Sequence, residues 1–310
     1  MRRSDLSHTF PHSSHTMHTL ALAALALTPT FAQPNTAPPG NIVEVAQTSG
    51  NFTTLVAALQ ATNLDLVLDG STNDTRWTVF APTDAAFNLL PPGTVQALLA
   101  DLPTLTEILL YHVVEEGLLA ANVLASTTID TVNGQRLAVS LQGRLPFVDQ
   151  SLITLTDIVT SNGVIHVIDA VLLPNLATLV QTAASAPQAE YLVHLIGQVP
   201  GLAGALDAGT FTVFAPVNAA FQAIPPGRLR ELTRPTGIST LATVLGVHVV
   251  PGRLFADDVI AAGALTSLQG KVLDVQVIGG SVFVGGAQVL VADVQTRNGN
   301  IHLIDRVLLP

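Results

Sequence analysis

The chain contains no cysteine, and few of its residues are charged or aromatic. Of its 310 residues, 11% are charged and 5% are aromatic, while 48% are hydrophobic. The lack of cysteine excludes disulfides, thiolate metal sites, cysteine nucleophiles and a lipid-modified cysteine anchor. Folding must therefore rest on packing, and the hydrophobic content is far above that of a disordered chain.

Long apolar runs and basic patches are also missing. Gly, Pro, Thr or Asp interrupts each hydrophobic stretch before it reaches the roughly 18–20 residues that span a bilayer. The 12 Lys and Arg residues face 22 Asp and Glu residues, which gives a formal net charge of −10. Because the basic residues form no cluster that would neutralise phosphates, the sequence argues against a nucleic-acid partner.

The N-terminal region has the pattern of a secretory signal peptide. Leu20–Leu27 is a short apolar segment, and Thr30 and Ala32 supply the small residues that precede a signal-peptidase cut. We expect residues 1–32 to be the signal peptide and residues 33–40 to be a Pro-rich linker.

The same pattern predicts where the protein acts. We expect the mature protein to be secreted, in an extracellular or periplasmic location, with no transmembrane anchor after signal cleavage. Translation can start at Met1 or at Met17, and the two alternatives stay open. The leader and the lack of cysteine are typical of a bacterial protein.

The rest of the chain is one pattern written twice. Two segments of the first half return in the second half, at offsets of 134 and 136 residues. They are Thr78–Pro82 with Thr212–Pro216, and Asn162–Asp169 with Asn298–Asp305. A period of this length is that of a whole domain and not of a solenoid unit. The sequence therefore predicts two domains, at residues 41–174 and 175–310.

Each copy begins with helical periodicity and ends with strand periodicity. In the first copy, Leu55, Val56 and Leu59 have helical spacing, and Trp77–Ala81 has the β-branched and aromatic composition of a buried strand. Further on, apolar residues alternate with polar ones around Val139. The predicted fold class is α+β, with helices followed by a largely antiparallel sheet that includes the early strand.

Smaller signals predict element ends and turns. Thr94 and Thr104 are predicted N-caps of two helices, and Pro103 is predicted to end the first of them. Asn133-Gly134, Gln142-Gly143 and Gly279-Gly280 are predicted hairpin turns, since glycine tolerates a positive φ.

Three ordered motifs in the first copy resemble those of the fasciclin (FAS1) domain family. Thr78–Phe87 resembles the first fasciclin signature, Asn162–Pro174 resembles the second, and Tyr111-His112 lies between them. The resemblance implies two tandem β-wedges, each built of mainly antiparallel strands packed with several helices. It also implies a secreted or surface-held adhesion or matrix protein. In animal members the Tyr-His region is linked to integrin contacts, and the second copy has Val247 in place of Tyr111.

Ten residues in or near these motifs are candidate adhesion or structural residues. They are Thr83, Asp84, Tyr111, His112, His166, Asp169, Asn218, His248, His302 and Asp305. We expect His166 to be buried and bonded to backbone groups, because a separation of three residues along a strand places Asp169 on the opposite face. We expect His112 to contact Thr83 or Asp84 and so to clasp the loop after the strand.

The predicted function is binding. We expect an exported, non-catalytic adhesion protein, with no catalytic residues, cofactor or metal, whose partner is a protein or polysaccharide of the cell surface or matrix. The alternative is an extracytoplasmic protein that binds a small molecule or carbohydrate. An enzyme is a weaker third hypothesis, because no Gly-x-Ser-x-Gly nucleophile motif occurs and Asn218 stands where the first copy has Asp84.

Overall fold

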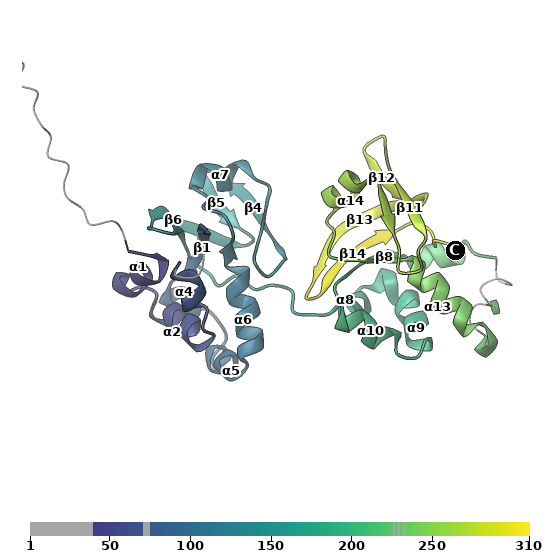
Figure 1. The fold of residues 1–310 in the computed structure, drawn as a ribbon, viewed down its shortest axis with the longest axis horizontal. Coiled ribbons are helices and arrows are strands. Elements are labelled where there is room, and N and C mark those ends of the chain that lie inside the picture. Colours follow the sequence, from purple (N-terminus) through teal and green to yellow (C-terminus); the bar gives the residue numbers. More distant parts are fainter. Residues whose placement is uncertain (1–39, 71–74, 226, 228–229, 232–233) are drawn as a thin grey trace, which may run out of the picture. The chain divides into compact units, whose positions relative to one another are not determined.

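The computed structural model describes residues 40–70, 75–225, 227, 230–231 and 234–310 (Figure 1). The predicted signal peptide and residues 33–39 of the predicted linker lie outside this part. No helix in the described ranges is long and apolar enough to cross a membrane.

The first copy has a mainly helical first half and a strand-rich second half. Its helices are α1 Ile42–Ser49, α2 Thr53–Ala61, α3 Asp65–Leu68, α4 Asp84–Asn88, α5 Thr94–Ala100, α6 Leu102–Tyr111 and α7 Ala120–Ala125. Its strands are β1 Trp77–Pro82, β2 Val113–Val114, β3 Thr128–Asp130, β4 Arg136–Gln142, β5 Leu145–Val148, β6 Ser151–Val159 and β7 Gly163–Ile168.

The second copy repeats this order of elements. Its described helices are α8 Leu179–Ser185, η1 Pro187–Ala189, α9 Glu190–Gln198, α10 Leu202–Ala208, α11 Asn218–Gln222, η2 Pro235–Gly237, α13 Ile238–Val247 and α14 Ala256–Ala262. Its strands are β8 Phe211–Pro216, β9 Val249–Pro251, β10 Ala264–Thr266, β11 Val272–Ile278, β12 Ser281–Val284, β13 Ala287–Thr296 and β14 Gly299–Ile304.

Each copy has one seven-stranded sheet with the same strand order. The order is β2-β1-β7-β6-β5-β4-β3 in the first copy and β9-β8-β14-β13-β12-β11-β10 in the second. Neighbouring strands are antiparallel except for one parallel pair in each sheet, β1 with β7 and β8 with β14. The predicted α+β class, with the early strand inside a largely antiparallel sheet, is therefore confirmed.

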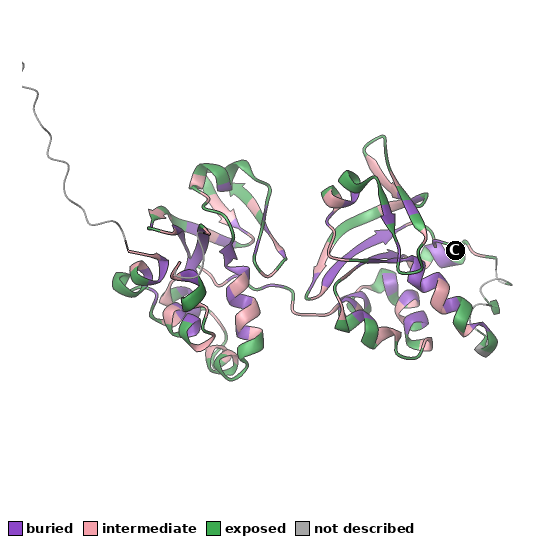
Figure 2. Cartoon of the chain, viewed as in Figure 1, coloured by how far each residue is buried: buried purple, intermediate pink, exposed green. Residues whose placement is uncertain are grey.

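The parallel pair lies at the centre of each core. Every residue of β1 and of β7 is buried, because helices cover one face and the curled remainder of the sheet covers the other (Figures 1 and 2). Val79 packs into the helix-side cluster, while Phe80 packs into a second cluster with Tyr111. Phe214 takes the place of Phe80 in the second copy, and both phenylalanines are 0% exposed.

The repeated Asn-Gly pair closes the helical half onto the central strands. The Asn162 side chain accepts a hydrogen bond from the Ile42 N–H at 3.0 Å and donates one to the Leu68 carbonyl at 2.7 Å. Glycine follows because a Cβ on Gly163 would collide with the Trp77 carbonyl. Asn298 and Gly299 repeat the arrangement, with Asn298 accepting from the Leu179 N–H and Gly299 packed on the Phe211 carbonyl.

Two predicted helix caps are wrong. Gly93, with φ of 86°, precedes α5, so Thr94 is its first residue and not its cap. The cap of α6 is Asp101, whose side chain accepts from the Thr104 N–H at 3.3 Å. Pro103 lies within the first turn of α6, where a missing N–H costs no helical hydrogen bond.

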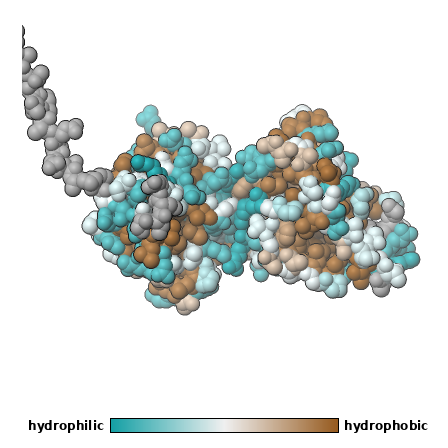
Figure 3. Space-filling model, in the orientation of Figure 1, coloured by the Kyte–Doolittle hydropathy of each residue, from teal (hydrophilic) through white to brown (hydrophobic). Residues whose placement is uncertain are grey.

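The predicted turns are found between antiparallel strands. Gly279 and Gly280 form the two-residue loop of the β11–β12 hairpin, with φ of 58° and 81°. Gly143 has φ of 68° in the β4–β5 loop, and Gly134 has φ of 84° between β3 and β4. Some apolar side chains of the hairpin strands stay at the surface, since Leu141 of β4 and Val277 of β11 are more than half exposed. Figure 3 shows apolar residues in several places on one face of the molecule.

Candidate functional site

The two residues after the first buried strand are helix caps. Thr83 is the N-cap of α4, and its hydroxyl accepts from the Ala86 N–H at 3.2 Å. Asp84 reaches α2, where its carboxylate accepts from the Thr53 and Thr54 N–H groups at 3.1 and 2.7 Å and from the Thr53 hydroxyl. Partial burial opposes ionisation of Asp84, but the hydrogen bonds from Thr54 and Thr53 outweigh it and lower its pKa.

Asn218 caps α9, the helix of the second copy that corresponds to α2. Its side-chain oxygen accepts from the Tyr191 N–H at 3.0 Å, and its amide donates to the Pro187 carbonyl at 2.8 Å. The same bond therefore joins Asp84 to Thr54 and Asn218 to Tyr191, which makes Thr54 and Tyr191 equivalent positions of the two copies.

Tyr111 is a core residue and not a surface contact. It is 4% exposed, and its hydroxyl donates to Asp149 Oδ2 at 2.8 Å. Burial and the neighbouring Asp149 carboxylate both raise the pKa of the phenol above its ordinary value. A binding partner could reach this side chain only if the core opened.

His112 and His248 tie a helix end to the segment after the last strand. His112 Nε2 accepts from the Leu172 N–H at 3.0 Å, so its Nδ1–H donates to the Ile108 carbonyl at 2.7 Å. His248 makes the same two bonds, from the Leu308 N–H at 2.9 Å and to the Val244 carbonyl at 2.8 Å. The predicted clasp between His112 and Thr83 or Asp84 is wrong, because both ring nitrogens are engaged elsewhere.

His166 and His302 hold a strand bulge. His166 Nε2–H donates to the Leu118 carbonyl at 2.9 Å, and Nδ1 accepts from the Asp157 N–H at 3.3 Å. Asp157 is a bulge residue with φ of 59°, and its carboxylate accepts from the Ala120 N–H at the start of α7. His302 repeats these bonds with Leu254 and with Asp293, whose φ is 60°. The expectation of a buried histidine bonded to backbone is confirmed.

Asp169 and Asp305 bond to backbone groups of the sheet and not to these histidines. Asp169 accepts from the Leu152 N–H at 2.8 Å, and Asp305 accepts from the Gln288 N–H at 2.8 Å. Neither carboxylate bonds to the histidine three residues before it, as the strand geometry predicts. In the part of the chain that the structure describes, no three His, Asp or Glu side chains are arranged to hold a metal ion.

Burial keeps the four repeated histidines neutral. Desolvation lowers the pKa of His112 and of His248 from 6.5 to about 4, against the opposing effect of the hydrogen bond to Ile108 or Val244. Desolvation also lowers the pKa of His166 and His302. Each ring is therefore a neutral bridge between main-chain groups at physiological pH.

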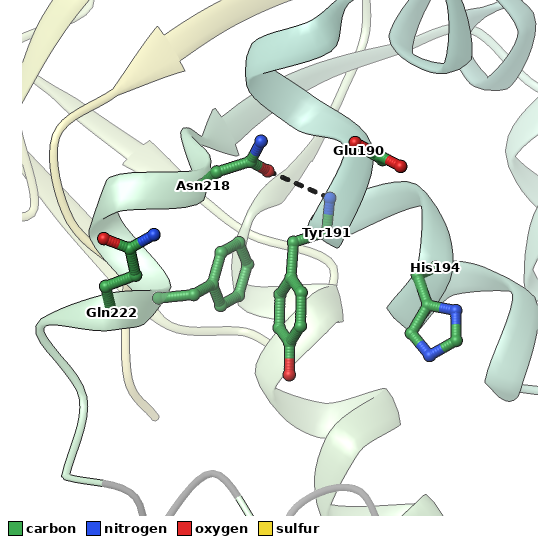
Figure 4. Close-up of a pocket in the computed structure, with 6 residues that line it drawn as sticks. Glu190, Tyr191, His194, Asn218 and Gln222 are labelled. Carbon is green, nitrogen blue, oxygen red and sulfur yellow. Dashed lines mark hydrogen bonds between the residues drawn. The ribbon is translucent and has the colours of Figure 1, made fainter.

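An open pocket lies between α9 and α11 of the second copy (Figure 4). Its volume is about 490 Å³, and it is lined by Glu190, Tyr191, His194, Asn218, Phe221 and Gln222. The Tyr191 and Phe221 rings form its apolar part, with centroids 4.8 Å apart and planes inclined by 53°. The carboxylate, imidazole and amide groups of the other residues lie around these rings.

Of these pocket residues, Asn218 alone is among the candidates predicted from the sequence. The others carry one signal in the sequence, a break in the repeat, because Tyr191 and His194 stand where the first copy has Thr54 and Ala57. The sequences of the surrounding helices, α2 and α9, are too dissimilar to show this equivalence on their own. The equivalent hydrogen bonds of Asp84 and Asn218 provide the alignment.

Comparisons with known proteins agree with the duplication. The family model of the fasciclin domain matches residues 50–174 and 187–310. Transforming growth factor-beta-induced protein ig-h3 of Sus scrofa is 28% identical over 272 residues, which cover 87% of this chain and 38% of that protein. Uncharacterized protein sll1735 of Synechocystis is 42% identical over 133 residues, which cover 43% of this chain and 97% of that protein.

One further protein and one solved structure are also similar to this chain. Immunogenic protein MPB70 of Mycobacterium bovis is 38% identical over 137 residues, covering 44% of this chain and 64% of that protein. A solved FAS1 domain pair from the insect cell adhesion molecule Fasciclin I covers 85% of this chain and 98% of that structure, with 18% identity and a TM-score of 0.42. With two matches to the family model and the same sheet in both copies, the chain belongs to the fasciclin domain family.

Proposed function

We propose that this chain is an exported, non-catalytic adhesion protein that binds a protein or polysaccharide of the cell surface or matrix. The observation that carries the proposal is the role of the repeated histidines. His112, His166, His248 and His302 are at most 1% exposed, and both ring nitrogens of each bond to main-chain groups. Side chains used in this way build the domain, which leaves its exposed surface to act on a partner.

Export is part of the proposal and rests on the leader sequence. The segment Leu20–Leu27 followed by Thr30 and Ala32 has the order of a signal peptide and its cleavage site. Mass spectrometry of the exported protein should find Gln33 at the N-terminus, as glutamine or as pyroglutamate. Retention of Met1 or Met17 in extracellular material would contradict the proposed cleavage.

We also propose that each copy is a domain that folds by itself, with boundaries at 41–174 and 175–310. Support comes from the core clusters, since the two of the first copy and the two of the second share no residue. Residues 41–174 expressed alone should give a monomer with a single cooperative unfolding transition. Failure of both copies to fold separately would contradict these boundaries.

The pocket between α9 and α11 favours a second candidate function, the binding of a small molecule or carbohydrate outside the cytoplasm. Its volume of about 490 Å³ falls in the range of about 300–1,000 Å³ that is typical of small-ligand sites. It also combines apolar rings with several polar groups, as such sites do.

Binding to isolated cell-surface material tests the main proposal. The full chain is incubated with envelope and matrix fractions, and the sedimented protein is measured at increasing concentrations. Saturable binding to at least one fraction is expected. Background retention in every fraction would contradict an adhesion role.

A further inference from the structure

The pocket between α9 and α11 is a property of the second copy and not of the fasciclin repeat. Tyr191 and His194 are replaced by Thr54 and Ala57 at the equivalent positions of α2. The first copy therefore lacks the partly exposed Tyr191 ring and the imidazole, although it keeps Phe87 where the second copy has Phe221. A feature that the fold does not require, built from aromatic and polar groups, points to a ligand.

We propose that this pocket binds a neutral sugar residue of a polysaccharide. The inference rests on the proposed function and names the chemistry that its partner would present. The partly exposed Tyr191 ring offers the apolar surface against which the C–H face of a pyranose ring packs, and Phe221 lies beside it in the pocket lining. Tyr191 is partly exposed and packs on the buried Phe221, so its ring is held in place before a ligand arrives.

The polar groups around the rings can form hydrogen bonds with the hydroxyl groups of a sugar, which both donate and accept. The Glu190 carboxylate accepts, and the Gln222 amide both donates and accepts. Both side chains are exposed and bond to none of the other residues drawn in Figure 4. His194 is oriented by Gln198, whose amide nitrogen lies 3.0 Å from the imidazole Nε2.

The charge of the pocket lining favours a neutral ligand over an anionic one. Glu190 is the carboxylate of the lining, and none of the six lining residues is Lys or Arg. Among the described lining residues, no lysine or arginine would offset the charge of a phosphate, sulfate or uronic acid group that entered next to this carboxylate. Neutral hexoses and N-acetylated sugars avoid this repulsion.

Titration with defined oligosaccharides tests the proposal. Isothermal calorimetry of the full chain is performed with maltohexaose, cellohexaose, xylohexaose and N-acetylchitohexaose, and with oligogalacturonate as the anionic probe. We expect saturable binding of at least one neutral probe and weaker binding of oligogalacturonate. Binding restricted to oligogalacturonate, or binding of none of these probes, would overturn the proposal.

Two substitutions of Tyr191 locate the binding. Tyr191→Thr installs the residue of the first copy and should weaken the affinity by about tenfold or more. Tyr191→Phe keeps the ring and should leave the affinity within about threefold of the native value. The melting temperature of each variant is measured beside the affinity. Unchanged affinity in Tyr191→Thr, with the domain folded, would place the sugar elsewhere and overturn the assignment.

Treatment of the envelope fractions separates this inference from the proposed function. Periodate cleaves vicinal diols of sugars, while protease removes proteins. Loss of binding after periodate and retention after protease are expected. The reverse pattern would identify a protein partner and overturn the sugar proposal while the adhesion role stands. Background retention on untreated fractions contradicts the adhesion role itself.

Discussion

The Tyr111 hydroxyl donates a hydrogen bond to Asp149 Oδ2 at 2.8 Å, and the second copy has replaced both residues together. Val247 stands in place of Tyr111, and Gly285 stands in place of Asp149. The equivalence of the second pair follows from the backbone, since the Asp149 N–H donates to Ala138 and the Gly285 N–H donates to Asp274. Asp149 has φ of 51° and Gly285 has φ of 56°, a region where glycine is unstrained.

This paired replacement predicts energetic coupling within the first copy. Tyr111→Val alone removes a buried ring and the hydroxyl that bonds to Asp149. It should lower the free energy of unfolding by about 3–5 kcal/mol, the cost typical of truncating a large buried aromatic side chain. Asp149→Gly alone should remove the shorter of the two hydrogen bonds of the buried phenol, leaving the one to the Arg136 carbonyl at 3.3 Å, but should relieve the left-handed backbone. Denaturant unfolding of both single variants and the double variant should give a coupling energy of at least about 0.5 kcal/mol. Additive effects would show that the two sites are independent.

The histidine bridges predict equal effects in the two copies. His112→Ala leaves the Leu172 N–H and the Ile108 carbonyl without their partner, and His248→Ala does the same to Leu308 and Val244. Each substitution should cost about 1–3 kcal/mol of unfolding free energy. Thermal melts of the two variants provide the measurement. A large effect confined to His112 would restore a role for Asp84, which the second copy lacks.

The lowered histidine pKa values predict a loss of stability in mild acid. The unfolded chain takes up protons as the pH falls through 6.5, while His112 and His248 stay neutral in the folded state down to about 4. The stabilising contribution is therefore present above pH 6.5 and is lost between that pH and about 4. Its size is on the order of 3 kcal/mol for each of the two residues.

Unfolding free energies measured at intervals across this pH range test the prediction. In the His112→Ala and His248→Ala double variant, the dependence on pH should be shallower, because two of the groups that bind protons on unfolding are gone. An equally steep dependence in the double variant would assign the acid sensitivity to other residues.

The side chains that cap α2 and α9 predict that neither reciprocal exchange stabilises the protein. Asp84→Ala should cost about 0.5–2 kcal/mol, because the Thr53 and Thr54 N–H groups lose their acceptor. Asp84→Asn should cost less, since an amide oxygen still accepts. Asn218→Asp should destabilise the second copy, because a carboxylate cannot donate to the Pro187 carbonyl as the amide does. Calorimetric melts of the three variants decide between these outcomes, and a stabilising Asn218→Asp would be contrary to the geometry.

The architecture could be predicted from the sequence because a pattern that occurs in both copies is a stronger indication of structure than one that occurs once. Period-two apolar residues and glycine turns occur in both copies, and both copies have the same strand order. The buried state of His166 also followed from its place in a strand and from its repetition as His302. Such features depend on local spacing, which one-dimensional patterns record.

Contacts between distant segments could not be predicted in the same way. His112 bonds to Leu172, which is 60 residues further along the chain, and nothing near either residue identifies the other. The pocket residues Tyr191 and Phe221 are brought together by the packing of α9 on α11, and in the sequence each resembles an ordinary helix residue. The wrong caps at Thr94 and Thr104 arose because Thr is a frequent cap, while Gly93 and Asp101 were equally eligible.

One side-by-side measurement tests the central claim, that the repeated histidines build the domains while exposed surface of the second copy binds the partner. Binding to the envelope fraction and the melting temperature are measured for the native chain, His112→Ala and Tyr191→Thr, at a temperature where all three are folded. The account predicts that His112→Ala lowers the melting temperature and keeps the affinity, whereas Tyr191→Thr loses about tenfold or more in affinity. Loss of affinity in His112→Ala with an unchanged melting temperature, together with native affinity in Tyr191→Thr, would contradict it.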